Sequence, residues 1–200
     1  MSFNHLNKLS TFLYLILASQ FLQAQNFKED FAQKQYKITK TGMITLGSWA
    51  LGNIAINSAL ISGAEGSTKY FHEMNVYWNL VNLAIAGGGY WANQKSRNKE
   101  RNEYGILSEQ HKIEKSLLFN AGLDVAYMAA GQLLRERSKH VVENSQRLEG
   151  FGNGLILQGA FLFTFDVILH SIHVSHRKKH KNELQRLKLA FNSGGIRMYF

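Results

Sequence analysis

Four long stretches of the chain carry almost no charge, and this pattern constrains the fold more than any other feature. Residues 41–64 and 74–94 contain no Asp, Glu, Lys or Arg, while residues 116–134 and 150–173 contain one acid each, Asp124 and Asp166. A helix needs about 20 residues to cross a bilayer, and each stretch is about that long. We therefore predict an all-α fold of four long transmembrane helices packed as a bundle.

Two further patterns favour helices in lipid. The second stretch is bordered by Tyr77, Trp78, Tyr90 and Trp91, residue types that favour the membrane interface. Small residues also recur every four positions, which predicts close approach of helix backbones. These repeats are Gly122, Ala126 and Ala130, and Ala55, Ala59 and Gly63. A mean hydropathy of −0.21 favours the alternative of a soluble bundle, although polar connectors account for much of that low value.

Both ends of the chain differ from the middle. Residues 1–24 combine Lys8, an apolar core over 9–18 and a small residue at Ala24, which indicates a cleaved secretory signal peptide. Residues 25–176 form the predicted bundle domain, and residues 177–200 form a basic tail. The tail ends in LKLAFNSGGIRMYF, two alternating runs around residues 193–195, which predicts a short hairpin.

The net charge of +9 is concentrated at the C-terminal end of the chain. Residues 177–200 carry seven basic residues and one acid, so a tail rather than a domain is basic, and we predict no nucleic-acid partner. The positive-inside rule places this tail and the connector 95–115, with six basic residues and four acids, in the cytoplasm. Cleavage near Ala24 followed by four spans would place both outside, so these predictions conflict.

Polar residues recur at helical spacing within the apolar stretches, so each predicted helix carries a polar stripe. The structural interpretation is that these residues form hydrogen bonds between helices, each stabilising the bundle by about 0.6 kcal/mol. The functional interpretation is a proton or cation relay, because an intramembrane acid beside an imidazole can transfer protons or bind a cation. The candidate network comprises Asn53, Asn57, Asn75, Asn79, Asn82, Asn120, Asp124, Gln158, Asp166 and His170.

No catalytic residue, metal site or cofactor is predicted. A di-iron bundle needs paired Glu-x-x-His motifs, which the chain lacks, and haem ligation by His72 with His170 or His173 is geometrically conceivable but not required by the sequence. His173, His176 and His180 are expected at the solvated end of the fourth helix. The glycines of residues 150–154 lack the Gly-Lys-Ser/Thr of a phosphate loop and are expected to begin that helix.

Four segments carry a resemblance to a known group of proteins: TGMITLGSWALGNIAINS, FHEMNVYWNLVNLAIA, NAGLDVAYMAAG and LEGFGNGLILQGAFLFTFDVILH. Over residues 36–173 the chain resembles a family of uncharacterised, signal-bearing, four-helix membrane proteins found mostly in Bacteroidota. The resemblance implies a helical membrane protein of the cell envelope. It implies no activity and carries over no catalytic residue.

The sequence therefore predicts a non-enzymatic structural or accessory protein of the bacterial envelope, in the inner membrane. Its expected partners are the lipid bilayer and either a membrane protein or further copies of itself. One alternative is a small transporter or proton-conducting protein that uses Asp124, Asp166 and His170. Another is a soluble periplasmic bundle that binds an apolar ligand.

Overall fold

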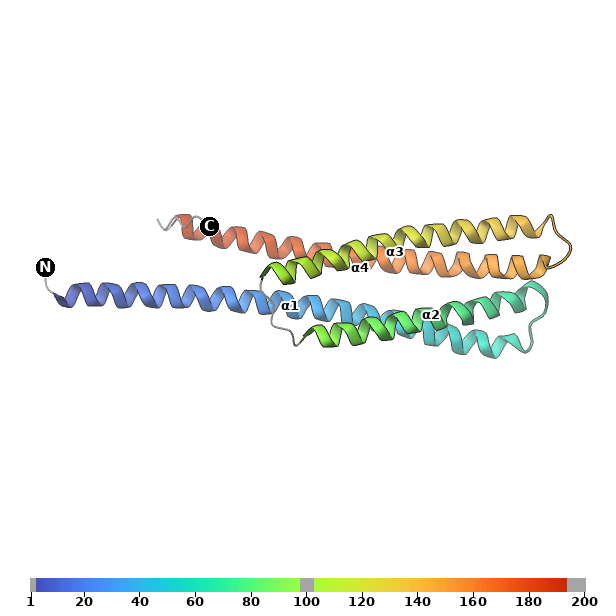
Figure 1. The fold of residues 1–200 in the computed structure, drawn as a ribbon, viewed down its shortest axis with the longest axis horizontal. Coiled ribbons are helices and arrows are strands. Elements are labelled where there is room, and N and C mark those ends of the chain that lie inside the picture. The colour runs from blue at the N-terminus through green and yellow to red at the C-terminus, as the bar shows by residue number, and fades with distance from the viewer. Residues whose placement is uncertain (1–2, 98–102, 194–200) are drawn as a thin grey trace.

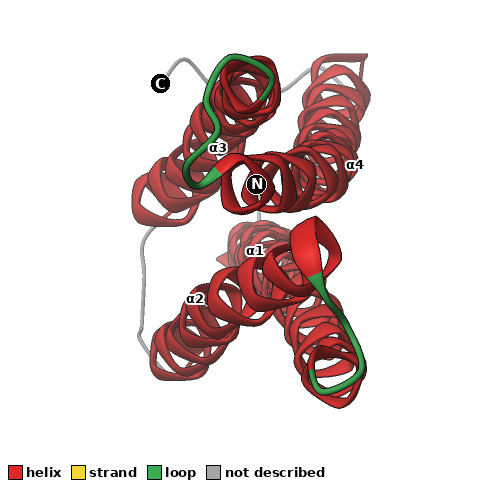
Figure 2. Cartoon of the chain, turned by 90° about the vertical axis from the view of Figure 1, so that its right-hand side faces the viewer, coloured by secondary structure: helices red, strands yellow, loops and turns green. Residues whose placement is uncertain are grey.

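The computed structural model describes residues 3–97 and 103–193, and it describes side chains for residues 29–97 and 104–182. Its elements are four α-helices, α1 (Phe3–Ile61), α2 (Gly66–Arg97), α3 (Glu103–Ser138) and α4 (Ser145–Ser193). Consecutive helices run antiparallel, so α1 with α2 and α3 with α4 form two long hairpins (Figure 1). Seen end on, one hairpin lies over the other (Figure 2). The predicted all-α, four-helix fold is confirmed.

The packing of the helices defines two ends of the molecule. The closest packing joins α3 to α4 and α1 to α2, and α2 also packs along α4. The α1–α2 and α3–α4 turns lie together at what we call the loop end, and the start of α1 and the end of α4 extend toward the opposite, terminal end (Figure 1). Arg97 and Glu103, where α2 ends and α3 begins, also lie at the terminal end.

Glycines near the start of α4 bring it close to two other helices. A Cβ atom built on Gly131 of α3 would lie 2.6 Å from the carbonyl oxygen of Gly152, and one built on Gly152 would lie 2.6 Å from that of Gly131. On another side of α4, Gly150 faces the backbone of Ser67 in α2. These positions therefore tolerate no side chain without separating the helices. The glycines of residues 150–154 do lie in the first turns of the fourth helix, as predicted.

The small-residue repeats singled out in the sequence do not make these contacts, and that prediction is wrong. Residues Ala55, Ala59, Ala126 and Ala130 are exposed, and a Cβ atom on Gly122 would meet nothing within 4 Å. Spacing alone did not show which face of each helix packs inward. The spacing of four recurs on the outward face as readily as on the inward one.

Three of the four helices are long and apolar enough to cross a membrane. The qualifying segments are Glu29–Ile61, Tyr104–Ser138 and Ser145–Asn182. The second predicted stretch, in α2, is not among them. The asparagines of α2 lower its mean hydropathy, but Asn75 and Asn79 are fully buried inside the bundle. The mean hydropathy of α2 therefore understates how apolar its outer face is.

Helices α1 and α4 continue through the predicted ends of the bundle domain. Helix α1 begins at Phe3, so the predicted signal segment and the first apolar stretch form one continuous helix. Helix α4 reaches Ser193, and residues 187–191, the first arm of the predicted hairpin, are helical. Leu, Lys and Ala are good helix formers, and an existing helix extends at little cost. The second arm lies outside the described residues.

Candidate functional site

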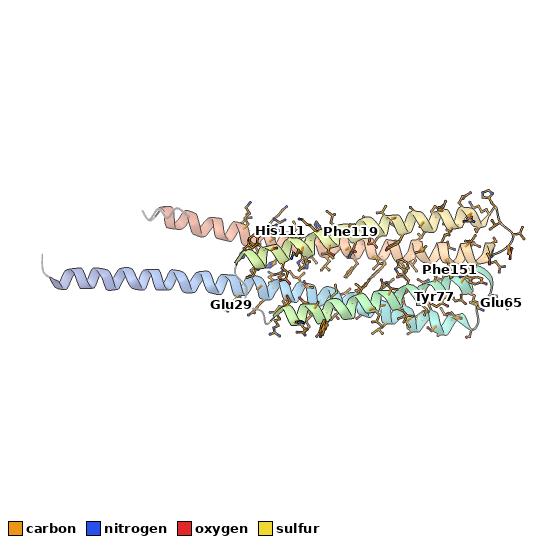
Figure 3. The ribbon with its side chains drawn as sticks, viewed as in Figure 1. Glu29, Glu65, Tyr77, His111, Phe119 and Phe151 are labelled. Atoms are coloured by element: carbon orange, nitrogen blue, oxygen red, sulfur yellow. The ribbon has the colours of Figure 1, made fainter. Side chains whose placement is uncertain are left out.

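The described part of the bundle has a polar interior and an apolar exterior. Thirteen buried residues are polar or charged and eight are hydrophobic. Large hydrophobic side chains face outward instead, with Ile56 62% exposed, Phe119 68% and Leu133 69%. Figure 3 shows side chains, Phe119 among them, projecting from the helices between Glu29 and His111 at the terminal end and Glu65 at the loop end. A water-soluble bundle has the opposite distribution.

Gln158 of α4 joins three helices at the centre of this interior. The Gln158 side chain is fully buried, and its Nε2 donates to Oδ1 of Asn75 in α2 at 2.5 Å and to Oδ1 of Asn53 in α1 at 3.4 Å. Its Oε1 accepts from Nε1 of Trp49 in α1 at 3.2 Å. The Trp49 ring also stacks on Phe161 of α4, with 3.7 Å between centroids. Both groups of the buried amide are therefore hydrogen-bonded.

The asparagines extend this network along α1 and α2 by one repeated arrangement. Nδ2 of Asn53, Asn57, Asn75 and Asn79 donates to the carbonyl oxygen four residues earlier, as from Asn53 to Trp49 at 3.0 Å and from Asn79 to Asn75 at 2.8 Å. Each Oδ1 is then available to accept from another side chain. Asn57 accepts from Nδ1 of His72 at 2.7 Å in this way, and Asn79 accepts from Nδ2 of Asn82 at 3.3 Å.

Two acids meet between α3 and α4. Asp124 and Asp166 are buried, with 3% and 6% of their surfaces exposed, and their two carboxyls lie close enough to interact. Two carboxylates held this close repel each other, and a proton held between them relieves the repulsion. Oδ2 of Asp124 is buried without a hydrogen-bond partner. The pair therefore has a buried acceptor atom to which a proton or a small cation would be attracted.

A second polar cluster lies nearer the terminal end, and the sequence analysis missed it. Gln110 of α3 is fully buried, and its Nε2 donates to Oε1 of Glu114 at 3.0 Å and to the carbonyl oxygen of His173 in α4 at 2.9 Å. Arg177 of α4 donates through Nε to Oε1 of Glu114 at 2.9 Å, forming an ion pair. These hydrogen bonds and the ion pair hold α3 against α4 near the terminal end.

A signal for this cluster was present in the sequence. The buried residues of α3 repeat at spacings of three and four, as Ile106, Gln110, Glu114, Leu117 and Ala121. Residues 95–115 were predicted to be a charged connector, so the continuation of the inward face through Gln110 and Glu114 was not predicted.

His173 does not lie at a solvated helix end, so the expectation for it is wrong. Its side chain is fully buried, and that of His180 is 8% exposed. The reason is that α1 and α3 extend far enough to cover α4 at this level: Gln110 of α3 bonds to His173, and the Phe31 ring of α1 lies 4.2 Å from the His180 ring.

Six of the ten candidate residues thus share one hydrogen-bonded network, and two form the acid pair. The remaining two, Asn120 and His170, are half-buried, and neither side chain hydrogen-bonds to this network. Within residues 29–97 and 104–182, no group of three His, Asp or Glu side chains is placed to hold a metal ion. His72, considered above as a haem ligand, donates through Nδ1 to Asn57.

The central part of the chain matches a known family. Residues 45–167 match a family of unknown function, DUF6992. The chain belongs to this family. No curated protein and no solved structure matches it. The DUF6992 region falls within residues 36–173, over which the resemblance was expected, and the family description concerns neither source organisms nor a signal peptide.

The DUF6992 region contains the polar core but not every feature of the bundle. The Gln158 network, the acid pair and the facing glycines of α3 and α4 all lie within residues 45–167. His173 and Arg177 follow the region, and residues 29–37 precede it. The α1 and α4 parts of the terminal end therefore lie outside the matched part of the chain, whereas the end of α2 and the start of α3 lie inside it.

Proposed function

We propose that this protein is a four-pass integral membrane protein of the bacterial envelope, in the inner membrane, with a non-enzymatic structural or accessory role. The observation that carries the proposal is the inverted polarity of the bundle, with amides and carboxyls inside and large apolar side chains outside. Lipid solvates that exterior, and the buried amides hold the helices together where lipid offers no hydrogen bonds. Helix α2 completes the fourth pass because it lies antiparallel along α1.

Extraction of membranes with alkaline carbonate tests this proposal. We expect the protein to remain in the membrane pellet and to enter solution with detergent. Recovery in the carbonate supernatant, or release of the protein by osmotic shock, would instead support the soluble periplasmic bundle. A peripheral protein expressed in the same cells serves as the control for complete stripping.

The charge distribution supports one orientation of the four passes. At the loop end, residues 62–73 and 135–149 carry five basic and five acidic residues. At the terminal end, the described residues 29–40, 95–97, 104–115 and 177–182 carry eleven basic residues and four acids. By the positive-inside rule the terminal end faces the cytoplasm.

Single cysteines test this orientation, because the natural chain has none. Val142→Cys lies at the loop end and is fully exposed, and Tyr104→Cys lies at the terminal end, where Tyr104 is 81% exposed. In intact spheroplasts an impermeant maleimide should label the cysteine at position 142 but not the one at position 104. The cysteine at position 104 should be labelled only after permeabilisation. Reversed labelling would refute the orientation and would support cleavage near Ala24, which leaves the terminal end outside.

The acid pair favours a second candidate function, proton or cation conduction. Asp124 and Asp166 lie together between α3 and α4, and ionisable residues inside membrane spans mark proton and ion pathways. Proteoliposomes with an internal pH dye test it. Conduction predicts proton flux that Asp166→Asn abolishes and that Glu143→Gln, an exposed acid in the loop, leaves intact. Absence of flux from the wild-type protein would support the structural role.

A further inference from the structure

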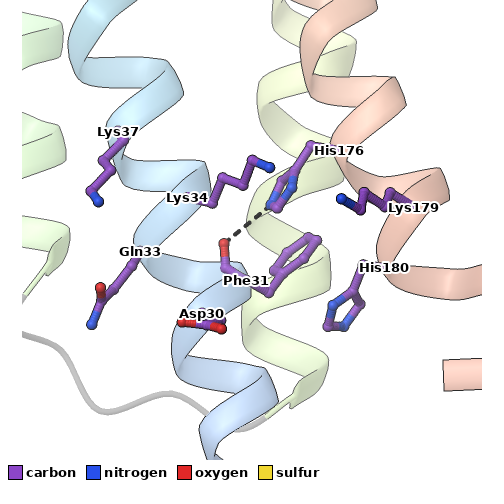
Figure 4. Close-up of a pocket in the computed structure, with 8 residues that line it drawn as sticks. All are labelled: Asp30, Phe31, Gln33, Lys34, Lys37, His176, Lys179 and His180. Carbon is purple, nitrogen blue, oxygen red and sulfur yellow. Dashed lines mark hydrogen bonds between the residues drawn. The ribbon is translucent and has the colours of Figure 1, made fainter. Parts of the chain in front are cut away.

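A cleft opens between α1 and α4 at the terminal end of the bundle (Figure 4). Its volume is about 460 Å³, and its walls come from segments about 145 residues apart in the chain. The lining residues are Asp30, Phe31, Gln33, Lys34, Lys37, His176, Lys179 and His180.

The cleft is basic. Three lysines and two histidines line it against one acid, Asp30. Lys34 extends from α1 and Lys179 from α4 toward the His176 ring, so ammonium groups approach the opening from both helices (Figure 4). Such a concentration of positive charge attracts anions, and ammonium groups bind phosphate well as point charges.

The floor of the cleft is fixed by contacts within the protein. Phe31 is 3% exposed, and its ring stacks on that of His176 with 4.2 Å between centroids and 18° between planes. His176 also donates through Nε2 to the carbonyl oxygen of Phe31 at 3.1 Å. These contacts hold α1 against α4, so the cleft exists before any ligand binds, which lowers the entropic cost of binding.

The cleft lies at the outer edge of the lipid headgroup layer when the apolar stretches fill the hydrocarbon layer. Lys37 and Lys34 precede the uncharged stretch of α1, which begins at residue 41, by four and seven residues. At 1.5 Å per residue their backbones lie about 6 and 10 Å outside the hydrocarbon, and a long lysine side chain extends from there toward the headgroups. Lys179 lies six residues beyond residue 173, about 9 Å. The headgroup layer is about 5 to 8 Å thick on each side.

We propose that this cleft binds the phosphate group of an anionic phospholipid headgroup. The inference rests on the proposed membrane location, which places the opening against the lipid leaflet of the terminal end. Basic pockets between transmembrane helices on the cytoplasmic side recognise anionic headgroups by the same electrostatics. The cleft lies outside residues 45–167 and is therefore a property of this chain, independent of the family match.

Titration of the purified protein in neutral detergent with dihexanoyl phosphatidylglycerol, a short-chain anionic phospholipid, tests the proposal. The wild-type protein should bind this lipid in preference to dihexanoyl phosphatidylcholine. The variant K34Q/K179Q should bind it about thirtyfold more weakly, the loss expected from two lysine contacts of about 1 kcal/mol each. Both lysines are exposed, so the variant should fold normally, which gel filtration and circular dichroism check.

The matched control is K112Q/K115Q, which removes two exposed lysines of α3 at the same end but outside the cleft. It should bind the anionic lipid as the wild type does. Equal weakening in both variants would show diffuse attraction and overturn the proposed site, as would unchanged binding in K34Q/K179Q. Inorganic phosphate that binds as tightly as the lipid would overturn the lipid source and assign the cleft to a soluble phosphoanion. Extraction of the protein by alkaline carbonate would refute the proposed membrane function. The phosphate titration measures binding to the cleft itself and does not depend on that function.

Discussion

Substitution of Gly131 by alanine tests the closest contact in the bundle. A Cβ atom at this position would lie 2.6 Å from the carbonyl oxygen of Gly152 and 3.1 Å from the backbone nitrogen of Ile156. Backbone atoms cannot rotate away, so α3 and α4 must separate by about 0.8 Å to reach ordinary van der Waals distance. Overpacking of this kind costs about 1 to 3 kcal/mol.

Gly122→Ala is the matched control on the same helix, because nothing lies within 4 Å of its added Cβ atom. Both variants gain the helix propensity of alanine over glycine, about 1 kcal/mol, so the difference between their stabilities isolates the steric cost. Unfolding of the purified protein in detergent, by heat or by titration with dodecyl sulfate, measures it. A difference of 2 kcal/mol corresponds to about 4 to 8 °C in Tm. If Gly131→Ala is as stable as Gly122→Ala, the proposed close approach of α3 and α4 is refuted.

Three further substitutions probe the polar interior by the same unfolding assay. Gln158→Leu removes the three side-chain bonds that join α1, α2 and α4 and should cost about 2 kcal/mol, whereas Leu157→Ala, on the exposed face, should cost less. Trp49→Phe keeps an aromatic ring but loses the indole donor to Gln158, for a cost of about 1 kcal/mol. Arg177→Met leaves the buried Glu114 without its cation and should cost about 3 kcal/mol, and stability equal to wild type would show that the ion pair contributes nothing.

The helices and their inward faces could be predicted where the periodicity was simple. In α2, the spacing of Asn75, Asn79 and Asn82 indicated one polar stripe, and all three side chains are buried together. The same reasoning failed for α3 at Gln110 and Glu114, because a charged surrounding sequence masked the inward repeat. Residues 187–191 also misled, because a short alternating run fits a strand in isolation, yet this one extends an existing helix.

The partners of each polar side chain could not be predicted. Asn53, Asn75 and Gln158 were identified separately on three stretches, but the sequence did not indicate that one amide of α4 would bond to both asparagines. Asp124 and Asp166 were identified on separate stretches, but the sequence did not indicate that their carboxyls would meet between α3 and α4. Such pairings depend on the rotation and stagger of whole helices, which many distant contacts determine together.

The sequence by itself determined that the chain forms long helices with apolar outer faces and polar stripes, because both properties depend on residues within a few turns of each other. Only the tertiary structure decided that glycines of α3 and α4 meet, that Lys34 and Lys179 share one cleft, and that the basic segments gather at one end. The physical reason is that these features join residues tens to more than a hundred positions apart. Their proximity follows from how four helices pack, which local periodicity does not specify.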